Sequence, residues 1–224
     1  MLQKADFLYN NWRYYIMLEN KFLSTIQFVE LDEMNFNTFS YEYISLLELI
    51  GSEIDTIFKE YYHINTNITH KMNPNICDYH KAICGDDTIN ACGVFPDISK
   101  WEVLTIYGKP IKLRPFEKWG NSADYSSLNF WQAYNDIKHN RTIKSNQASL
   151  NNVLTALSAL FLLEMELCKM IATQTREEND IPSPDSSLFR IEGWITNAIS
   201  PSDLLYVESD PPSPLQLIRP QSSM

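Results

Sequence analysis

The sequence has few glycines, no secretory signal and no long hydrophobic run, and each of these shortages excludes a class of protein. Six glycines in 224 residues argue against an all-β protein with many tight turns. The longest apolar run, near Phe161, is far shorter than the ~20 residues that span a bilayer. The first twelve residues, MLQKADFLYNNW, lack the basic stretch and apolar core of a secretory signal. We therefore expect a cytoplasmic protein that has no membrane as a partner.

Positive charge is also scarce. The chain carries 28 acidic residues against 18 basic ones, which gives a formal net charge of −10. This balance excludes a basic surface over the whole molecule, so we predict no footprint for DNA and no anionic membrane partner. Local basic patches remain open, because clusters of charge set the local field. The four cysteines do not indicate a disulfide scaffold in a chain of this size.

Apolar residues recur at helical spacing in the first third of the chain. Residues 5–30 and 40–62 each place them on one stripe, which predicts two long helices. Ser40 offers a side-chain oxygen to the first free N–H groups of the second helix. The short link between the two helices predicts an antiparallel hairpin. A shorter helix is predicted from Pro74 to Cys84, with Pro74 in its first turn.

The middle of the chain changes to a strand pattern. Residues 101–115, WEVLTIYGKPIKLRP, alternate on both sides of the turn signal Gly108-Lys109, and this predicts a β-hairpin inserted between helices. Residues 188–195 could add a further strand to this hairpin. Seven of the eleven prolines lie between positions 182 and 220, which predicts an extended, partly disordered tail from residue 176 to residue 224.

Two more helices are predicted before the tail. One ends near Arg141, with Ser122 or Ser126 as its cap. The other runs from about Gln147 to Thr173, and its apolar residues cover more than one stripe, which is typical of a helix at the centre of a bundle. The predicted fold is thus mainly α: a helical bundle of four to five helices over residues 1–175, with an inserted β-hairpin at about 101–115 and the extended Pro-rich C-terminal tail.

The strongest candidate site lies just before the central helix. Asn135 and His139 are four residues apart, so on a helix they share a face with Trp131. A histidine can act as general acid or base near neutral pH, and the cations Lys138 and Arg141 can hold a phosphate. These residue types suit cleavage of a phosphodiester by a ribose 2′-OH. The full candidate set is Trp131, Tyr134, Asn135, Lys138, His139 and Arg141, beside Asp136.

A structural interpretation of the same residues stays open. Basic residues in the last turn of a helix offset the negative end of its dipole. Asn135 and His139 could equally hydrogen-bond to neighbouring helices as a buried polar link.

Two further groups offer weaker chemistry. A zinc site would use thiol and imidazole ligands, although the usual paired cysteine spacing is missing and these residues could equally be an apolar helix face. The acids of the second helix are more typical of a solvated surface, paired with Arg13 or a lysine. The first group is Cys77, His80, Cys84 and Cys92, and the second is Glu48, Glu53 and Asp55.

The segment WQAYNDIKHNR, from Trp131 to Arg141, followed by a buried helix, resembles the HEPN-like all-α proteins of bacterial toxin–antitoxin and antiphage defence systems. Asn135 and His139 match the polar residue and the histidine of the family pattern. Tyr134 stands where that pattern has an arginine. The resemblance loosely covers residues 5–62 and 121–173, as two helix pairs.

This resemblance implies a metal-independent endoribonuclease that acts on RNA as a homodimer, without a cofactor or a metal. His139 would be the acid or base and Asn135 an orienting group, with Lys138, Arg141, Tyr134 and Trp131 binding the substrate. The alternative is a non-catalytic helical interaction module in a defence or regulatory complex, which the missing arginine, the acidic charge and the Pro-rich tail favour.

Overall fold

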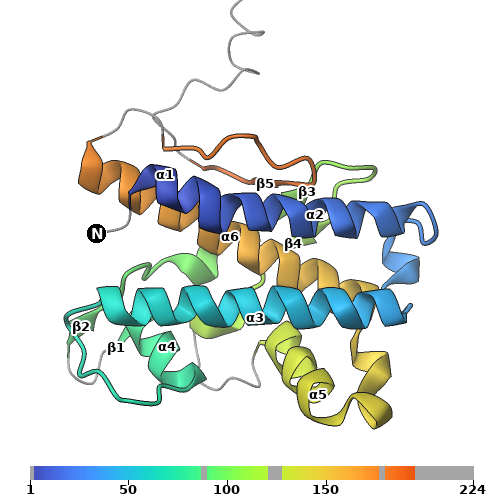
Figure 1. Ribbon diagram of the computed structural model, residues 1–224, viewed down its shortest axis with the longest axis horizontal. Helices are drawn as coiled ribbons and strands as arrows, with labels where there is room; N and C mark the ends of the chain where they lie inside the picture. Colours follow the sequence, from blue (N-terminus) through green and yellow to red (C-terminus); the bar gives the residue numbers. More distant parts are fainter. Residues whose placement is uncertain (1–2, 87–89, 121–127, 177–179, 195–224) are drawn as a thin grey trace, which may run out of the picture.

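The protein is mainly α-helical, as predicted, in a computed structural model that describes residues 3–86, 90–120, 128–176 and 180–194 (Figure 1). The helices are α1 (Lys4–Phe7), the π-helical turn η1 (Leu8–Trp12), α2 (Arg13–Ile26), α3 (Tyr41–Ile64), α4 (Ile76–Cys84), α5 (Asn129–Lys144) and α6 (Leu150–Thr175). The strands are β1 (Gly85–Asp86), β2 (Ala91–Cys92), β3 (Val103–Thr105), β4 (Lys112–Leu113) and β5 (Phe189–Ile191). Among the described residues, no helix is both long enough and apolar enough to cross a membrane.

The first two predicted helices form the expected hairpin. The segments α1, η1 and α2 follow one another as a single rod, and α3 runs back beside it (Figure 1). Ser40 caps α3, because its Oγ accepts a hydrogen bond from the backbone N–H of Tyr43 at 3.1 Å. The prediction of this cap from the sequence is therefore confirmed.

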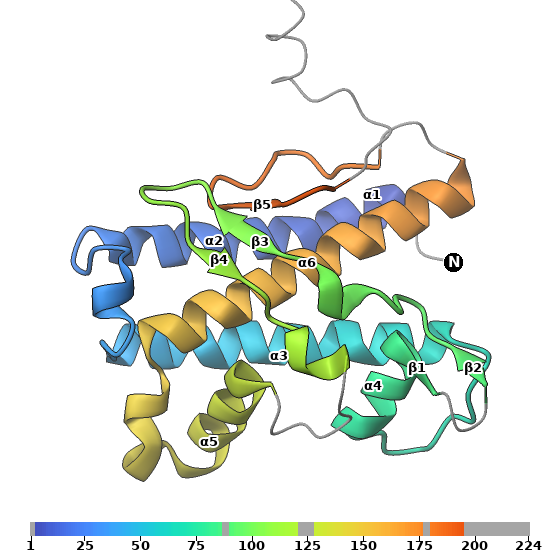
Figure 2. The ribbon, with the colours of Figure 1, turned by 180° about the vertical axis from the view of Figure 1, so that it is seen from behind.

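The helix α6 lies at the centre of the bundle, between the α1–α2 rod and α3 (Figures 1 and 2). Its residues from Val153 to Cys168 are buried almost without interruption, on every side of the helix. Ser149 caps it by accepting a hydrogen bond from the backbone N–H of Asn152. The helix therefore begins a few residues later than Gln147, and its all-round burial is as the sequence predicted.

The predicted hairpin is present, and a third strand pairs with it. The strands β3 and β4 pair antiparallel, and β5 pairs antiparallel with the other edge of β3, in the order β4-β3-β5. The strand predicted at residues 188–195 thus corresponds to β5. Figure 2 shows this small sheet lying over α6 on the face of the molecule opposite to α3.

The segment before β5 is fastened to α2 by a buried carboxylate. Glu19, 1% exposed, accepts hydrogen bonds from the hydroxyls of Tyr15 and Ser186 and from the backbone N–H of Ser187, the last at 2.7 Å. Trp12 adds a hydrogen bond from its indole N–H to the carbonyl of Pro184 at 2.8 Å. Leu188, Phe189 and Ile191, which belong to the predicted tail, are therefore part of the same hydrophobic core, and Ile181 packs against it.

Some boundaries differ from the predictions. The helix α4 begins at Ile76 rather than at Pro74, because Asn75 is its cap and forms a reciprocal capping box with Asp78. Ser122 and Ser126, the predicted caps of α5, lie outside the described residues, as does the tail from residue 195 onward.

Candidate functional site

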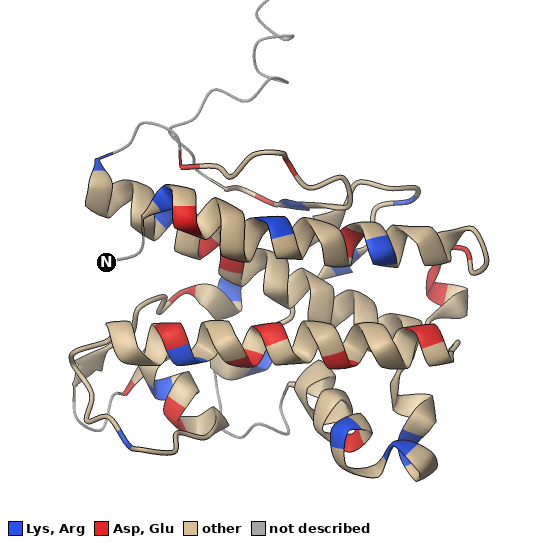
Figure 3. Ribbon diagram, in the orientation of Figure 1, with Lys and Arg blue, Asp and Glu red and all other residues tan. Residues whose placement is uncertain are grey.

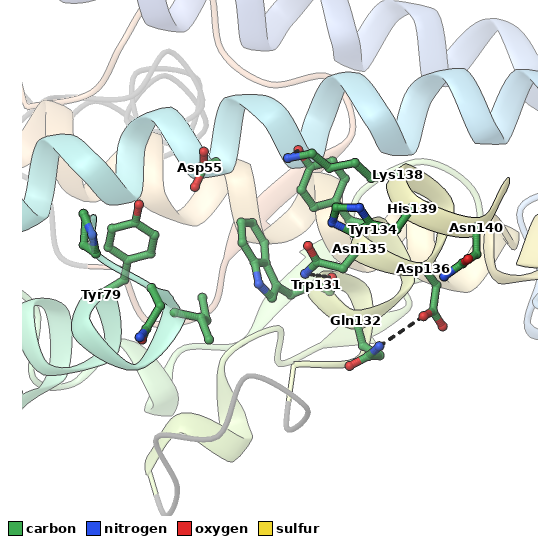
Figure 4. Close-up of a pocket in the computed structure, with 13 residues that line it drawn as sticks. Asp55, Tyr79, Trp131, Gln132, Tyr134, Asn135, Asp136, Lys138, His139 and Asn140 are labelled. Carbon is green, nitrogen blue, oxygen red and sulfur yellow. Dashed lines mark hydrogen bonds between the residues drawn. The ribbon is translucent and has the colours of Figure 1, made fainter. Parts of the chain in front are cut away.

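A cleft of about 480 Å³ opens between α3, α4 and α5. Figures 1 and 2 both place α4 and α5 on the side of α3 that faces away from α2, so the two shorter helices flank the cleft beneath α3. The residues that line it are Asp55, Pro74, Asn75, Ile76, Tyr79, Trp131, Gln132, Tyr134, Asn135, Asp136, Lys138, His139 and Asn140 (Figure 4).

Five of the six predicted site residues line this cleft. Trp131 and Tyr134 are buried, Asn135 is half-buried, and Lys138 and His139 are exposed. His139 is therefore not a buried structural link between helices. It is accessible to a ligand, and a lysine stands next to it in the chain.

Arg141, the sixth predicted residue, does not line the cleft. It is exposed and follows a kink at Asn140, whose φ of −141° and ψ of 36° interrupt the helical backbone of α5. The two predicted cations therefore lie on opposite sides of the kink. Lys138 lines the cleft, whereas Arg141 lies in the exposed turn that follows the kink.

Tyr134 is held in place by an unusually close helix contact. A Cβ atom at Gly51 of α3 would come within 2.3 Å of Cδ2 in the Tyr134 ring, so only glycine fits there. The tyrosine hydroxyl lies 3.4 Å from Nζ of Lys138, whose ammonium also lies 5.3 Å from the centre of the ring. At the position where the family pattern has an arginine, the structure thus has an aromatic ring that orients a neighbouring cation.

Asn135 is oriented by its own helix. Its side-chain amide donates a hydrogen bond to the carbonyl of Trp131 at 2.9 Å, one turn earlier (Figure 4). Gln132 and Asp136 make a similar pair at 3.2 Å on the adjoining side of α5. These local bonds fix the polar rim of the cleft without help from another helix.

The opposite wall comes from α3 and α4. Asp55 is on α3, and its carboxylate forms an ion pair with Lys59 at 2.6 Å. Tyr79, on α4, lines the same wall, and Figure 4 shows it on the Asp55 side of the cleft. Burial first, and then the charge of Asp55, raises the pKa of Tyr79, so this phenol keeps its proton as a donor. Figure 4 shows Asp55 and Tyr79 toward one end of the cleft and Asp136 and Asn140 toward the other.

The two long walls of the cleft differ in charge. The helix α3 carries five acidic residues and one lysine, whereas α5 carries one acidic residue and three basic ones. Figure 3 shows this contrast as mainly red positions along α3 and blue positions on α5. A ligand with an anionic part and a hydrogen-donating part would match such a cleft.

The zinc alternative lacks a ligand set. Within the described part of the chain, no group of three or more His, Cys, Asp or Glu side chains could hold a metal ion. His80 instead hydrogen-bonds through Nε2 to the carbonyl of Trp119 at 2.8 Å. Burial raises the pKa of the Cys84 thiol to about 12, which opposes formation of the thiolate that zinc requires.

The acidic group on α3 is split between two environments. Asp55 faces the cleft and pairs with a lysine, as the structural interpretation of the sequence allowed. Neither Glu48 nor Glu53 lines the cleft. Burial, and then the charge of Glu60, raises the pKa of Glu53.

The wall that contains Asp55 and Tyr79 was not predicted as part of the site. The two residues are on different helices, and no spacing in the sequence indicates that they meet. The only sequence signal was the presence of Asp55 among the acids of α3.

Comparison with known proteins adds no relative, since no protein-family model, no curated protein and no solved structure matches the chain.

Proposed function

We propose that the protein is a metal-independent endoribonuclease of the HEPN-like type, with its site in the cleft between α3, α4 and α5. The observation that carries this proposal is the exposed position of His139 on the rim of an open cleft, next to Lys138. A histidine needed only for stability would more often be buried and hydrogen-bonded.

The chemistry follows from the two side chains. The imidazole of His139 takes the proton from a ribose 2′-OH, and the 2′-oxygen attacks the adjacent phosphorus. Lys138 offsets the charge that develops on the phosphate oxygens. The bond to the 5′-oxygen breaks, and this oxygen takes up a proton, which leaves a 2′,3′-cyclic phosphate and a 5′-hydroxyl. Asn135, fixed by its bond to Trp131, lies one turn before the histidine and would orient the ribose or the phosphate.

A homodimer would complete the acid–base pair. One cleft contributes one histidine, whereas the reaction needs a base for the 2′-OH and an acid for the leaving oxygen. A second copy of His139, placed across a two-fold axis, would supply the acid. We therefore propose that the active form contains two chains.

The test uses His139→Ala and a matched control. Purified protein should convert single-stranded RNA into products that end in a 2′,3′-cyclic phosphate, as detected by mass spectrometry, and excess EDTA should not stop it. His139→Ala should lower the rate by about 10²- to 10⁴-fold, the usual contribution of a general acid or base. His63→Ala, which removes another exposed histidine outside the cleft, should leave the rate unchanged. If wild-type protein cleaves no RNA as monomer or dimer, the proposal is wrong.

A second candidate function is a non-catalytic interaction module. Four large apolar side chains are exposed in and beside the connection between α2 and α3, and such groups favour protein contacts. They are Phe28, Met34, Phe39 and Tyr41, which are between 52% and 92% exposed. In that case Phe28→Ser with Tyr41→Ser should release a co-purifying protein partner, whereas His139→Ala should keep it.

A further inference from the structure

The proposed cleavage by His139 gives no role to Asp55, the acidic residue on the α3 wall of the same cleft. Asp55 lines the cleft, and its side chain is 27% exposed despite its contacts. A carboxylate repels phosphate, so Asp55 does not help to hold the backbone of RNA. It does suit a part of the ligand that offers N–H groups, because an ionised carboxylate only accepts hydrogen bonds.

The carboxylate of Asp55 is held by an ion pair on its own helix. Lys59, one turn later on α3, contacts Oδ2 at 2.6 Å. Two oxygens have about four acceptor positions between them, so the carboxylate keeps capacity for a ligand after the contact with Lys59 is made.

Among the four RNA bases, guanine matches a fixed carboxylate best. Its Watson–Crick edge presents two neighbouring donors, N1–H and the N2 amino group. Adenine and cytosine each present one amino donor beside an acceptor nitrogen, and uracil presents one N–H between two carbonyls. We propose that Asp55 recognises a guanine base of single-stranded RNA by accepting hydrogen bonds from N1–H and N2–H. This inference rests on the proposed ribonuclease function and names the base that the cleft selects.

The rest of the cleft suits the other parts of a guanine nucleotide. Tyr79 and Trp131 line it, and because they are only 3% and 7% exposed they form an apolar floor against which the edge of an unpaired base can pack. The phosphate would lie toward Lys138 and His139 on the basic helix α5. The volume of about 480 Å³ lies within the range of ~300–1,000 Å³ that is usual for small-molecule sites.

A binding experiment separates recognition from cleavage. The probes are short fluorescent oligouridines, each with one central guanosine, inosine or adenosine, and with 2′-deoxyribose throughout so that no cleavage occurs. Inosine lacks only the N2 amino group. Wild-type protein should bind the guanosine probe about tenfold or more tightly than the inosine probe, the effect of losing one hydrogen bond to a charged group. The adenosine probe should bind at least as weakly as the inosine probe.

The variant Asp55→Asn should abolish this preference. Asparagine has nearly the same shape as aspartate, and the side chain of Asp55 is 27% exposed, so the fold should persist, but the amino group of asparagine opposes the donors of guanine. The guanosine and inosine probes should then bind within about twofold of each other. Glu48→Gln is the matched control, because it neutralises an acid two turns earlier on α3 that does not line the cleft, and it should keep the wild-type preference.

The outcomes separate the two proposals. RNA that is cleaved equally beside guanine and adenine, or a guanine preference that survives in Asp55→Asn, overturns the role of Asp55 and leaves the ribonuclease in place. Guanosine-selective binding that Asp55→Asn removes, without any cleavage of the matching RNA, supports the recognition and refutes the nuclease. Absence of both binding and cleavage overturns both.

Discussion

Two buried glutamates, one on α2 and one on α6, have opposite surroundings. Glu19 is 1% exposed and is surrounded by donors from Tyr15, Ser186 and Ser187. Glu164 is 0% exposed, and neither of its oxygens has a hydrogen-bond partner among the described residues. Burial alone is therefore a poor guide to the role of a carboxyl group. The number of donors around it decides whether it stabilises the fold.

Glu19 and Glu164 affect different parts of the molecule. Glu19 joins α2 to the segment before β5, which places that strand against the sheet. Glu164 lies inside the bundle, where burial and then the charges of Glu53 and Glu60 raise its pKa well above the ordinary value. Glu19 stabilises the contact between α2 and the segment before β5. Burial of Glu164 destabilises the folded state, and other contacts in the core must offset that loss of free energy.

The largest expected effect is the loss of Glu19. Glu19→Ala removes the acceptor of two hydroxyls and one backbone N–H, so hydrogen bonds to a buried carboxylate are lost and we expect the free energy of unfolding to fall by about 2–4 kcal/mol. Urea denaturation followed by circular dichroism measures this change. Glu33→Ala removes an exposed acid and should alter stability by less than about 0.5 kcal/mol. If the two substitutions lowered the free energy of unfolding equally, the hydrogen bonds of Glu19 would contribute no more to stability than an exposed acid does.

A substitution at Glu164 should act in the opposite direction. Glu164→Met replaces a carboxyl group that lacks partners by an apolar side chain of similar size, and we expect about 1–3 kcal/mol of stabilisation at pH 7. Glu164→Gln is the matched control, since it removes the ionisable group but keeps a polar one. A destabilising Glu164→Met would show that the carboxyl group has partners after all.

The pH dependence of stability tests the same group. At low pH the carboxyl is protonated in both states. As the pH rises above the ordinary value of 4.5, the unfolded chain releases this proton and the folded protein keeps it, so stability falls. Glu164→Met and Glu164→Gln should both flatten that decline. Glu166, whose pKa burial raises to about 7, adds a second decline that ends near pH 7 and should remain in both variants.

The sequence predicted those features that depend on the residue pattern within a single helix or strand. Helical periodicity predicted α3 and α6, and the four-residue spacing of Asn135 and His139 predicted that they share a face of a helix, where both line the cleft. A periodic pattern shows which face of a helix is buried or polar. It does not show which other helix that face meets.

The cap of α4 at Asn75 and the kink at Asn140 are local features that the sequence patterns missed, whereas the other unpredicted features depend on contacts between distant segments. The fit of Tyr134 against Gly51 joins two helices, and the bond between Glu19 and Ser186 spans 167 positions of the chain. Ser186 lies in a Pro-rich region whose composition indicated an extended tail. Composition describes the average tendency of a segment, and a single well-placed acceptor on α2 is enough to dock part of it.

Asp55 is an intermediate case between the two buried glutamates, and it gives the smallest expected effect. Its ion pair with Lys59 is half exposed, with side-chain exposures of 27% and 52%. Lys59→Ala should therefore lower the free energy of unfolding by about 0.3–0.5 kcal/mol at low salt, and the difference should vanish at high salt. Denaturant unfolding at two salt concentrations measures it. A loss near that of Glu19→Ala would place Asp55 among the carboxylates that hold the fold together, whereas a small loss leaves it available for a ligand.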